Sequence, residues 1–263
     1  MKPRLQATAL VTGAGSPIGS VYADRLAKRG YDLILVDNDK LQIEALAQCI
    51  SFDTGRHVEV VVADLCNARD VGRVEKIVRE STQVTALVNG AASGGSPHLL
   101  EATTEELVQE LDVNVMALAR LTMAAAARFR SVSYGSIINV ASVASIAPER
   151  TNGVSCGARS FVLAFTLMLH KELACSDIRV QAVLPGALAT DFWDLAGVPI
   201  EDFPRSVVTS AVELVDAALR AFDEGELISV PALPDIVDCN AYDTARRALL
   251  PSSFHRTHIA GAA

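Results

Sequence analysis

Residues 12–19 read Thr-Gly-Ala-Gly-Ser-Pro-Ile-Gly and follow directly on an apolar run at residues 7–11. A strand that turns through glycines into a helix aims backbone N–H groups and the positive end of the helix dipole at one point, which suits a pyrophosphate. Pro17 stands where a middle glycine is usual; it fits the first helical position, with the loss of one N–H. We therefore expect this turn to bind a dinucleotide, through Gly13, Ser16 as N-cap, Ile18 and Gly19.

The rest of the chain alternates short apolar runs with longer helical patterns. Apolar runs without polar alternation are typical of parallel strands covered on both faces. The pattern predicts a single Rossmann-type α/β domain over residues 1–263, a doubly wound seven-stranded parallel sheet with ligands at the carboxyl ends of its strands. The expected strands are 7–11, 33–36, 58–63, 84–88, 136–140, 180–184 and 227–230, and the expected helices are 18–29, 40–50, 68–80, 103–129, 157–175 and 207–223.

Charge and cysteine content exclude several classes of protein. The net charge of -8 argues against a nucleic-acid partner, because phosphate binding needs clustered basic residues. The five cysteines are scattered and form no Cys-x-x-Cys pair, so neither a metal site nor a disulfide framework is expected. The first apolar run is too short for a signal peptide or a membrane span, and we expect a cytoplasmic protein.

Asp37 ends the second expected strand, about twenty residues beyond the glycines. A carboxylate there accepts hydrogen bonds from the adenosine ribose and repels a 2'-phosphate. With no Lys or Arg in residues 12–19, the local charge favours NAD over NADP.

At this point the chain resembles the short-chain dehydrogenase/reductase family over nearly its whole length. The resemblance implies NAD(H)-dependent interconversion of an alcohol and a carbonyl. It implies a water-holding role for Asn114 and substrate binding by Ser142. Gly90 and Ala92 depart from the family pattern in Asn-Gly-Ala-Ala at residues 89–92, as Pro17 does in the first turn. The further cofactor contacts that it implies are Asp64, Leu65, Asn89, Ala91, Pro185, Gly186 and Thr190.

Two positions depart from the family where its chemistry is concentrated. The family's Tyr-x-x-x-Lys motif falls, in register, on Ser155 and Arg159. Reduction of a carbonyl needs a proton donor with a pKa near the working pH, and serine is a much weaker acid than tyrosine. Arg159 keeps a positive charge that could bind the nicotinamide ribose, but it does not release a proton as lysine does. Both changes preserve binding better than catalysis.

A substitute proton donor is not evident. Tyr134 lies about 26 Å along its strand from Ser142, at the other end of the sheet, and residues 143–154 contain no tyrosine. His98, Glu149 and Tyr242 stay open as candidate proton donors. His98 and Glu149 can equally be exposed loop residues without a catalytic role.

Three functions remain open: an oxidoreductase with an atypical site, a nucleotide-binding protein without turnover that serves a regulatory or structural role, and a redox-neutral enzyme. The family places its substrate loop at about residues 187–206, and a tail follows at about 235–263. The apolar and aromatic side chains of this loop suit a hydrophobic substrate, and they suit a hydrophobic cap over the sheet equally well. Apolar residues on more than one face of two helices predict a homodimer or homotetramer. These residues are Leu118, Leu121, Met123, Phe161, Leu163, Phe165, Leu167 and Leu169.

Overall fold

A computed structural model of the chain describes residues 7–94, 100–146, 154–188 and 208–231, with isolated positions 241, 244–246 and 248. By contacts within the chain it forms two compact units, Met1–Ala232 and Leu233–Ala263. The first unit contains the sheet and the predicted site.

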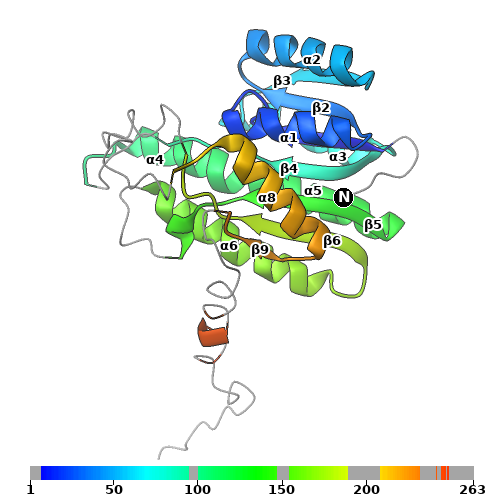
Figure 1. The fold of residues 1–263 in the computed structure, drawn as a ribbon. Coiled ribbons are helices and arrows are strands. Elements are labelled where there is room, and N and C mark those ends of the chain that lie inside the picture. The colour runs from blue at the N-terminus through cyan, green and yellow to red at the C-terminus, as the bar shows by residue number, and fades with distance from the viewer. Residues whose placement is uncertain are drawn as a thin grey trace, which may run out of the picture. The chain divides into compact units, whose positions relative to one another are not determined.

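A seven-stranded parallel sheet runs through this unit, as the sequence predicts (Figure 1). Its strand order is β3-β2-β1-β4-β5-β6-β9. The order reverses between β1 and β4, which is where doubly wound sheets open a crevice for a ligand. The strands are β1 (Thr8–Thr12), β2 (Asp32–Asp37), β3 (Val58–Val62), β4 (Val84–Asn89), β5 (Tyr134–Val140), β6 (Asp177–Val183) and β9 (Ile228–Ser229).

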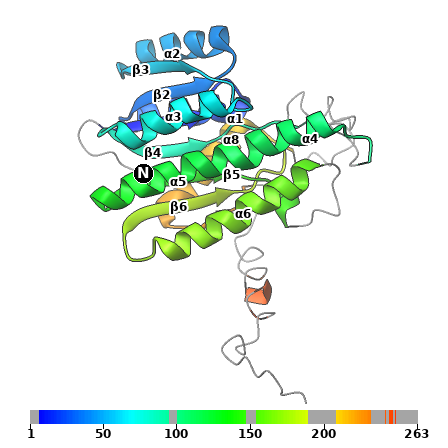
Figure 2. The same ribbon diagram turned by 180° about the vertical axis from the view of Figure 1, so that it is seen from behind.

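Helices cover both faces of the sheet. Figure 1 shows α1 and α8 in front of the sheet, and Figure 2, the view from the opposite side, shows α3, α5 and α6 in front of its other face. The helices are α1 (Pro17–Lys28), α2 (Lys40–Thr54), α3 (Ala68–Glu80), α4 (Thr104–Leu111), α5 (Leu118–Val132), α6 (Val154–Glu172) and α8 (Ala211–Glu224), with a short 3-10 helix η2 (Val143–Ser145). None of the described helices combines the length and apolarity needed to cross a membrane.

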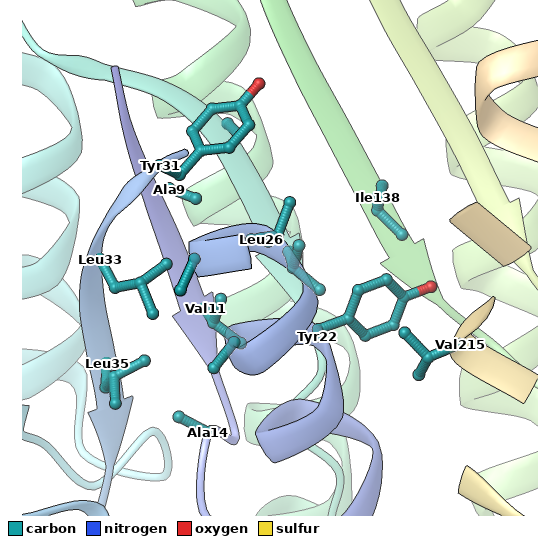
Figure 3. Packing of buried hydrophobic residues seen from close by; sticks show 14 of the residues in the cluster. Ala9, Val11, Ala14, Tyr22, Leu26, Tyr31, Leu33, Leu35, Ile138 and Val215 are labelled. Atoms are coloured by element: carbon teal, nitrogen blue, oxygen red, sulfur yellow. The ribbon is translucent and has the colours of Figure 1, made fainter. Parts of the chain in front are cut away.

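Each face of the sheet has its own apolar core. On the α1 side, Tyr22 and Leu26 pack against strand residues and reach Val215 of α8 (Figure 3). On the other side, Leu121 and Phe129 of α5 pack over β4 and β5 with residues of α3 and α6. The two cores explain why the strands are apolar along their length without polar alternation.

Two features were not predicted. The helix expected over 103–129 is interrupted by a π-helical segment η1 (Asp112–Ala117), which contains Asn114. A pair of two-residue strands, β7 (Ala187–Leu188) and β8 (Val208–Thr209), forms a second small sheet. A strand of two residues is too short to show a hydrophobic period, and a π segment changes the helical repeat without a sequence signal of its own.

Candidate functional site

The glycine-rich turn is packed so closely at Gly13 and Gly19 that neither position has room for a side chain. Gly13 has φ of +64°, and a Cβ on it would lie 2.5 Å from the Cα of Ala91 after β4. A Cβ on Gly19 would lie 2.0 Å from the carbonyl oxygen of Gly13. The turn, the start of α1 and the end of β4 are therefore in backbone contact, as a phosphate-binding turn requires.

Ser16 begins α1 as its N-cap, as predicted, and its hydroxyl accepts a hydrogen bond from the Gly19 amide at 3.0 Å. The Ser20 amide donates to the Ser16 carbonyl, and Pro17 has no amide hydrogen. In the first turn of α1, the Gly19 and Ser20 amides are thus already hydrogen-bonded and Pro17 has none. The Ile18 amide is left to bind an anion at the helix N-terminus. The residues fit a dinucleotide pyrophosphate, although with fewer donors than an all-glycine turn.

Asp37 lies at the carboxyl end of β2, beside this turn. Its Oδ2 accepts a hydrogen bond from the Gly15 amide at 2.9 Å, and its Oδ1 accepts from the Asn38 and Asp39 amides. These bonds fix a carboxylate next to the glycine-rich turn.

The ends of β3 and β4 supply the other predicted nucleotide contacts. Asp64 Oδ1 accepts from the Cys66 amide at 2.9 Å, and Leu65 is buried in a small cluster with Val113. The Asn89 side chain points into the core, where it donates to Thr122 and Asn139 at 2.9 Å each. Asn89 can therefore reach a nucleotide only through its backbone.

Asn114 is buried in the π segment and ties it to the loop after β4. Its Oδ1 accepts from the Ser93 amide at 3.0 Å, and its Nδ2 donates to the Ser93 carbonyl at 2.6 Å. Both ends of the amide are thus used to hold the loop that follows the nucleotide site. π segments are often found at functional sites.

Ser142 and the start of α6 meet at the carboxyl end of β5. Ser142 follows β5 and caps η2, with its hydroxyl accepting from the Ala144 amide at 3.2 Å. Ser145 of η2 donates its hydroxyl to the carbonyl of Arg159 at 2.9 Å. Helix α6 begins at Val154, so Ser155 lies in its first turn. Arg159 therefore lies at the end of β5, beside the short helix that Ser142 caps, and Ser155 lies about one turn before Arg159 on α6.

The Arg159 side chain reaches back to the sheet, where Nη1 donates to the Val140 carbonyl at 3.1 Å. The residue is half-buried, with its guanidinium held against the backbone at the end of β5. This burial lowers the pKa of Arg159 to about 10, an effect opposed by the negative charge of Glu110. Arg159 is still a cation at neutral pH.

The remaining predicted residues are only partly described. The carbonyl of Pro185 accepts from the Val143 amide at 2.9 Å, which places the loop after β6, including Gly186, beside the Ser142 loop. Thr190, His98, Glu149 and Tyr242 lie outside the described residues, as does most of the expected substrate loop. Tyr134 is the first residue of β5, at the opposite end from Ser142, which confirms that it is remote.

Glu110 was missed by the sequence analysis. It lies one turn before Asn114 and is only 4% exposed, whereas its neighbours on α4 are exposed. The sequence of α4, Thr-Glu-Glu-Leu-Val-Gln-Glu-Leu, contains three glutamates that look alike. Only the spacing of four residues between Glu110 and Asn114 could have placed it on the inner face.

Comparisons with known proteins agree with this geometry. The family model of the short chain dehydrogenases matches residues 7–197. A short-chain dehydrogenase from Sphingobium yanoikuyae, solved in complex with NADPH, is 38% identical with a TM-score of 0.89, covering 98% of both chains. A bulky-bulky ketone specific alcohol dehydrogenase from Comamonas testosteroni is 36% identical with a TM-score of 0.86, covering 98% of this chain and 97% of that one. A diacetyl reductase from Staphylococcus epidermidis is 31% identical over 71% of this chain and 73% of its own length. The chain therefore belongs to the short-chain dehydrogenase family.

Proposed function

We propose that this protein binds NAD(H) and interconverts an alcohol and a carbonyl at the carboxyl end of the sheet. The observation that carries the proposal is the position of Arg159 at the end of β5, beside the short helix that Ser142 caps, at the same sheet edge as the closely packed glycine-rich turn. The nicotinamide, when bound, would accept or supply the hydride. The residues that would hold the nucleotide are those of the turn, Asp37, the ends of β3 and β4, and the loop after β6.

The preference for NAD over NADP is supported by Asp37. Because its carboxylate is fixed by the Gly15, Asn38 and Asp39 amides, it cannot move far from a 2'-phosphate. The similar protein from Sphingobium yanoikuyae was solved with NADPH, which argues the other way, so affinity has to be measured.

Isothermal titration calorimetry with NADH and NADPH tests this step. We expect NADH to bind at least about tenfold more tightly, because an unpaired like charge at close range costs roughly 1.4 kcal/mol or more. Asp37→Asn should reduce this difference, while Asp53→Asn, an exposed residue of α2, should leave it unchanged. Tighter binding of NADPH by the unaltered protein would contradict the preference.

In the proposed reaction, Ser142 orients the carbonyl oxygen by donating its hydroxyl proton in a hydrogen bond. As the hydride reaches the carbon, the oxygen takes up one proton to complete the alcohol. Ser155 is a weak acid and Arg159 remains protonated at neutral pH, so we assign the proton to water near Ser155. Asn114 supports this site by holding the loop at Ser93.

A second candidate function is nucleotide binding without turnover. It is favoured by Ser155 and Arg159, which replace the tyrosine and lysine of the family motif. Without an acid of suitable pKa, the site keeps its binding residues and loses about 100- to 10,000-fold in rate. Following NADH absorbance with a panel of ketones and aldehydes separates the two. Turnover of about 1 per second or faster identifies an enzyme, whereas nucleotide binding with no turnover above the uncatalysed rate identifies a binding protein.

The substrate we propose is a hydrophobic ketone with bulky groups on both sides of the carbonyl. The support is the apolar and aromatic composition of residues 187–206 and the similarity to a bulky-bulky ketone specific enzyme. A ketone panel graded by size tests it. Faster reduction of acetone than of diaryl or aryl-alkyl ketones would contradict it.

We also propose that the protein forms a homodimer or homotetramer. Only some of the apolar residues on the two helices support this proposal. Leu118, Leu121, Leu163 and Leu169 are buried within the chain, so they cannot form a subunit interface. The large apolar residues that are exposed on η1, α5 and α6 are Met116, Met123, Val132, Phe161 and Met168. The Phe161 ring stacks on the Phe165 ring with 5.4 Å between their centroids, so the two rings form one apolar surface on α6.

A further inference from the structure

Gln42 brings a side-chain amide to the glycine-rich turn, next to Asp37. It is the third residue of α2, where its backbone amide donates to the capping carboxylate of Asp39 at 3.0 Å. Helical side chains tilt toward the N-terminus of their helix, so this one extends back toward the end of β2. A Cβ on Gly15 would lie 2.8 Å from Gln42 Oε1 and 3.2 Å from Asp37 Oδ2. The amide and the carboxylate therefore face the same small space beside Gly15.

The Asp37 carboxylate has little capacity left for the ribose of a nucleotide. Its Oδ1 accepts from the Asn38 and Asp39 amides, and its Oδ2 accepts from the Gly15 amide. An ionised carboxylate has about four acceptor sites, so these bonds leave about one, on Oδ2. The adenosine ribose of NAD has two hydroxyl groups that can donate. Asp37 can therefore hold one of them, and a second acceptor beside it would hold the other.

The Gln42 side chain can supply that acceptor. It is exposed, and among the residues that the structure describes none forms a hydrogen bond with its amide, so the oxygen is open to a ribose hydroxyl. A 2'-phosphate in the same space would meet this oxygen and the charge of Asp37. The basic residue nearest in sequence, Lys40, lies with its ammonium 3.7 Å from Glu44. The space beside Gly15 therefore suits hydroxyl donors better than an anion.

We propose that Gln42 is a specificity-determining residue of the nucleotide site, which accepts a hydrogen bond from the adenosine ribose beside Asp37 and disfavours a ribose that carries a 2'-phosphate. This inference rests on the proposed binding of NAD(H). It adds a residue of α2 to a preference that otherwise depends on Asp37 alone. Because the adenosine ribose is remote from hydride transfer, Gln42 acts on affinity and its test needs no turnover.

Calorimetry with NADH and NADPH on three variants tests this role. Gln42→Met keeps the length of the side chain and removes the amide, so NADH should bind about 3- to 10-fold more weakly, and NADPH should lose less. Gln42→Glu keeps an acceptor at the same place, so NADH affinity should stay within about threefold. NADPH affinity should fall at least about tenfold in this variant, because a second carboxylate faces the 2'-phosphate. Gln48→Met, at an exposed position of the same helix, is the matched control and should change neither affinity.

The exposure of Gln42 keeps these variants folded, so the midpoint of thermal unfolding should not change and a lost affinity reports on the site. An unchanged NADH affinity in Gln42→Met would overturn the inference. A loss for NADPH as large as that for NADH would also overturn it, because the amide would then serve both nucleotides alike. If the unaltered protein bound neither nucleotide, the proposed function would fail together with this inference, whereas NADH binding that is insensitive to Gln42 would remove the inference alone.

Discussion

Gly19→Ala should damage the nucleotide site through a single added methyl group. The new Cβ would lie 2.0 Å from the carbonyl oxygen of Gly13 and 3.0 Å from the Cα of Ala14. Because carbon contacts are comfortable only beyond about 3.5 Å, the backbone has to move by about 1.5 Å. No flexible side chain is available to give way, since each of these atoms belongs to the backbone.

The energetic effect can be worked out from the contacts of Gly13. Its carbonyl accepts hydrogen bonds from the Ser16 hydroxyl at 2.7 Å and the Ser16 amide at 3.0 Å, and the displacement breaks both. Overpacking costs about 1–3 kcal/mol and each lost hydrogen bond about 1 kcal/mol, while alanine gains about 1 kcal/mol in helix propensity. The net loss is about 2–4 kcal/mol, or roughly 4–16 °C in the unfolding midpoint.

Thermal unfolding and NADH calorimetry on Gly19→Ala measure the two effects, and we expect affinity to fall at least about tenfold. Gly72→Ala is the matched control, because Gly72 also lies in a helix, and its new Cβ would lie no closer than 3.6 Å to Arg120. It should be equally stable or up to about 1 kcal/mol more stable. A Gly19→Ala protein with unchanged stability and affinity would refute the close packing of the turn.

Two further predictions concern the core and the subunit interface. Asn139 is fully buried and forms hydrogen bonds with Asn89, Thr122 and Thr166. Asn139→Leu leaves these partners unsatisfied and should lower the free energy of unfolding, measured in urea, by about 3–5 kcal/mol. A loss below about 1 kcal/mol would contradict this. Phe161→Glu should lower the molar mass measured by light scattering toward that of a monomer. Phe52→Glu, at an exposed position of α2, is the control and should leave the molar mass unchanged. An unchanged molar mass for Phe161→Glu would contradict a role of α6 in the interface.

The fold could be predicted because its signals are local. Each central strand is an apolar run, and the helix predicted over 68–80 has those bounds in the structure. Ser16 and Pro17 mark the start of α1 by their capping chemistry. The π segment and the β7–β8 pair could not be predicted, because they depend on tertiary contacts such as the bonds between Asn114 and Ser93.

The site could be predicted less completely than the fold. Ser142, Ser155 and Arg159 could be predicted as site residues because a motif places them in register after β5 and at the start of α6. Glu110 belongs to no motif, and its burial depends on how α4 packs on α6. The direction of the Asn89 side chain likewise depends on partners that are distant in sequence, Thr122 and Asn139.

The central claim is that the nucleotide and substrate residues are present, while Ser155 and Arg159 stand in place of the tyrosine that donates the proton and the lysine that lowers its pKa. The double change Ser155→Tyr and Arg159→Lys restores both, and NADH oxidation with a ketone panel measures the result against the unaltered protein and each single change. We predict that the double change raises the rate about 100- to 10,000-fold and that each single change does much less, because the two groups work as a unit. No gain in the double change, with NADH binding retained, would contradict the claim, and so would an unaltered protein already as fast as the double.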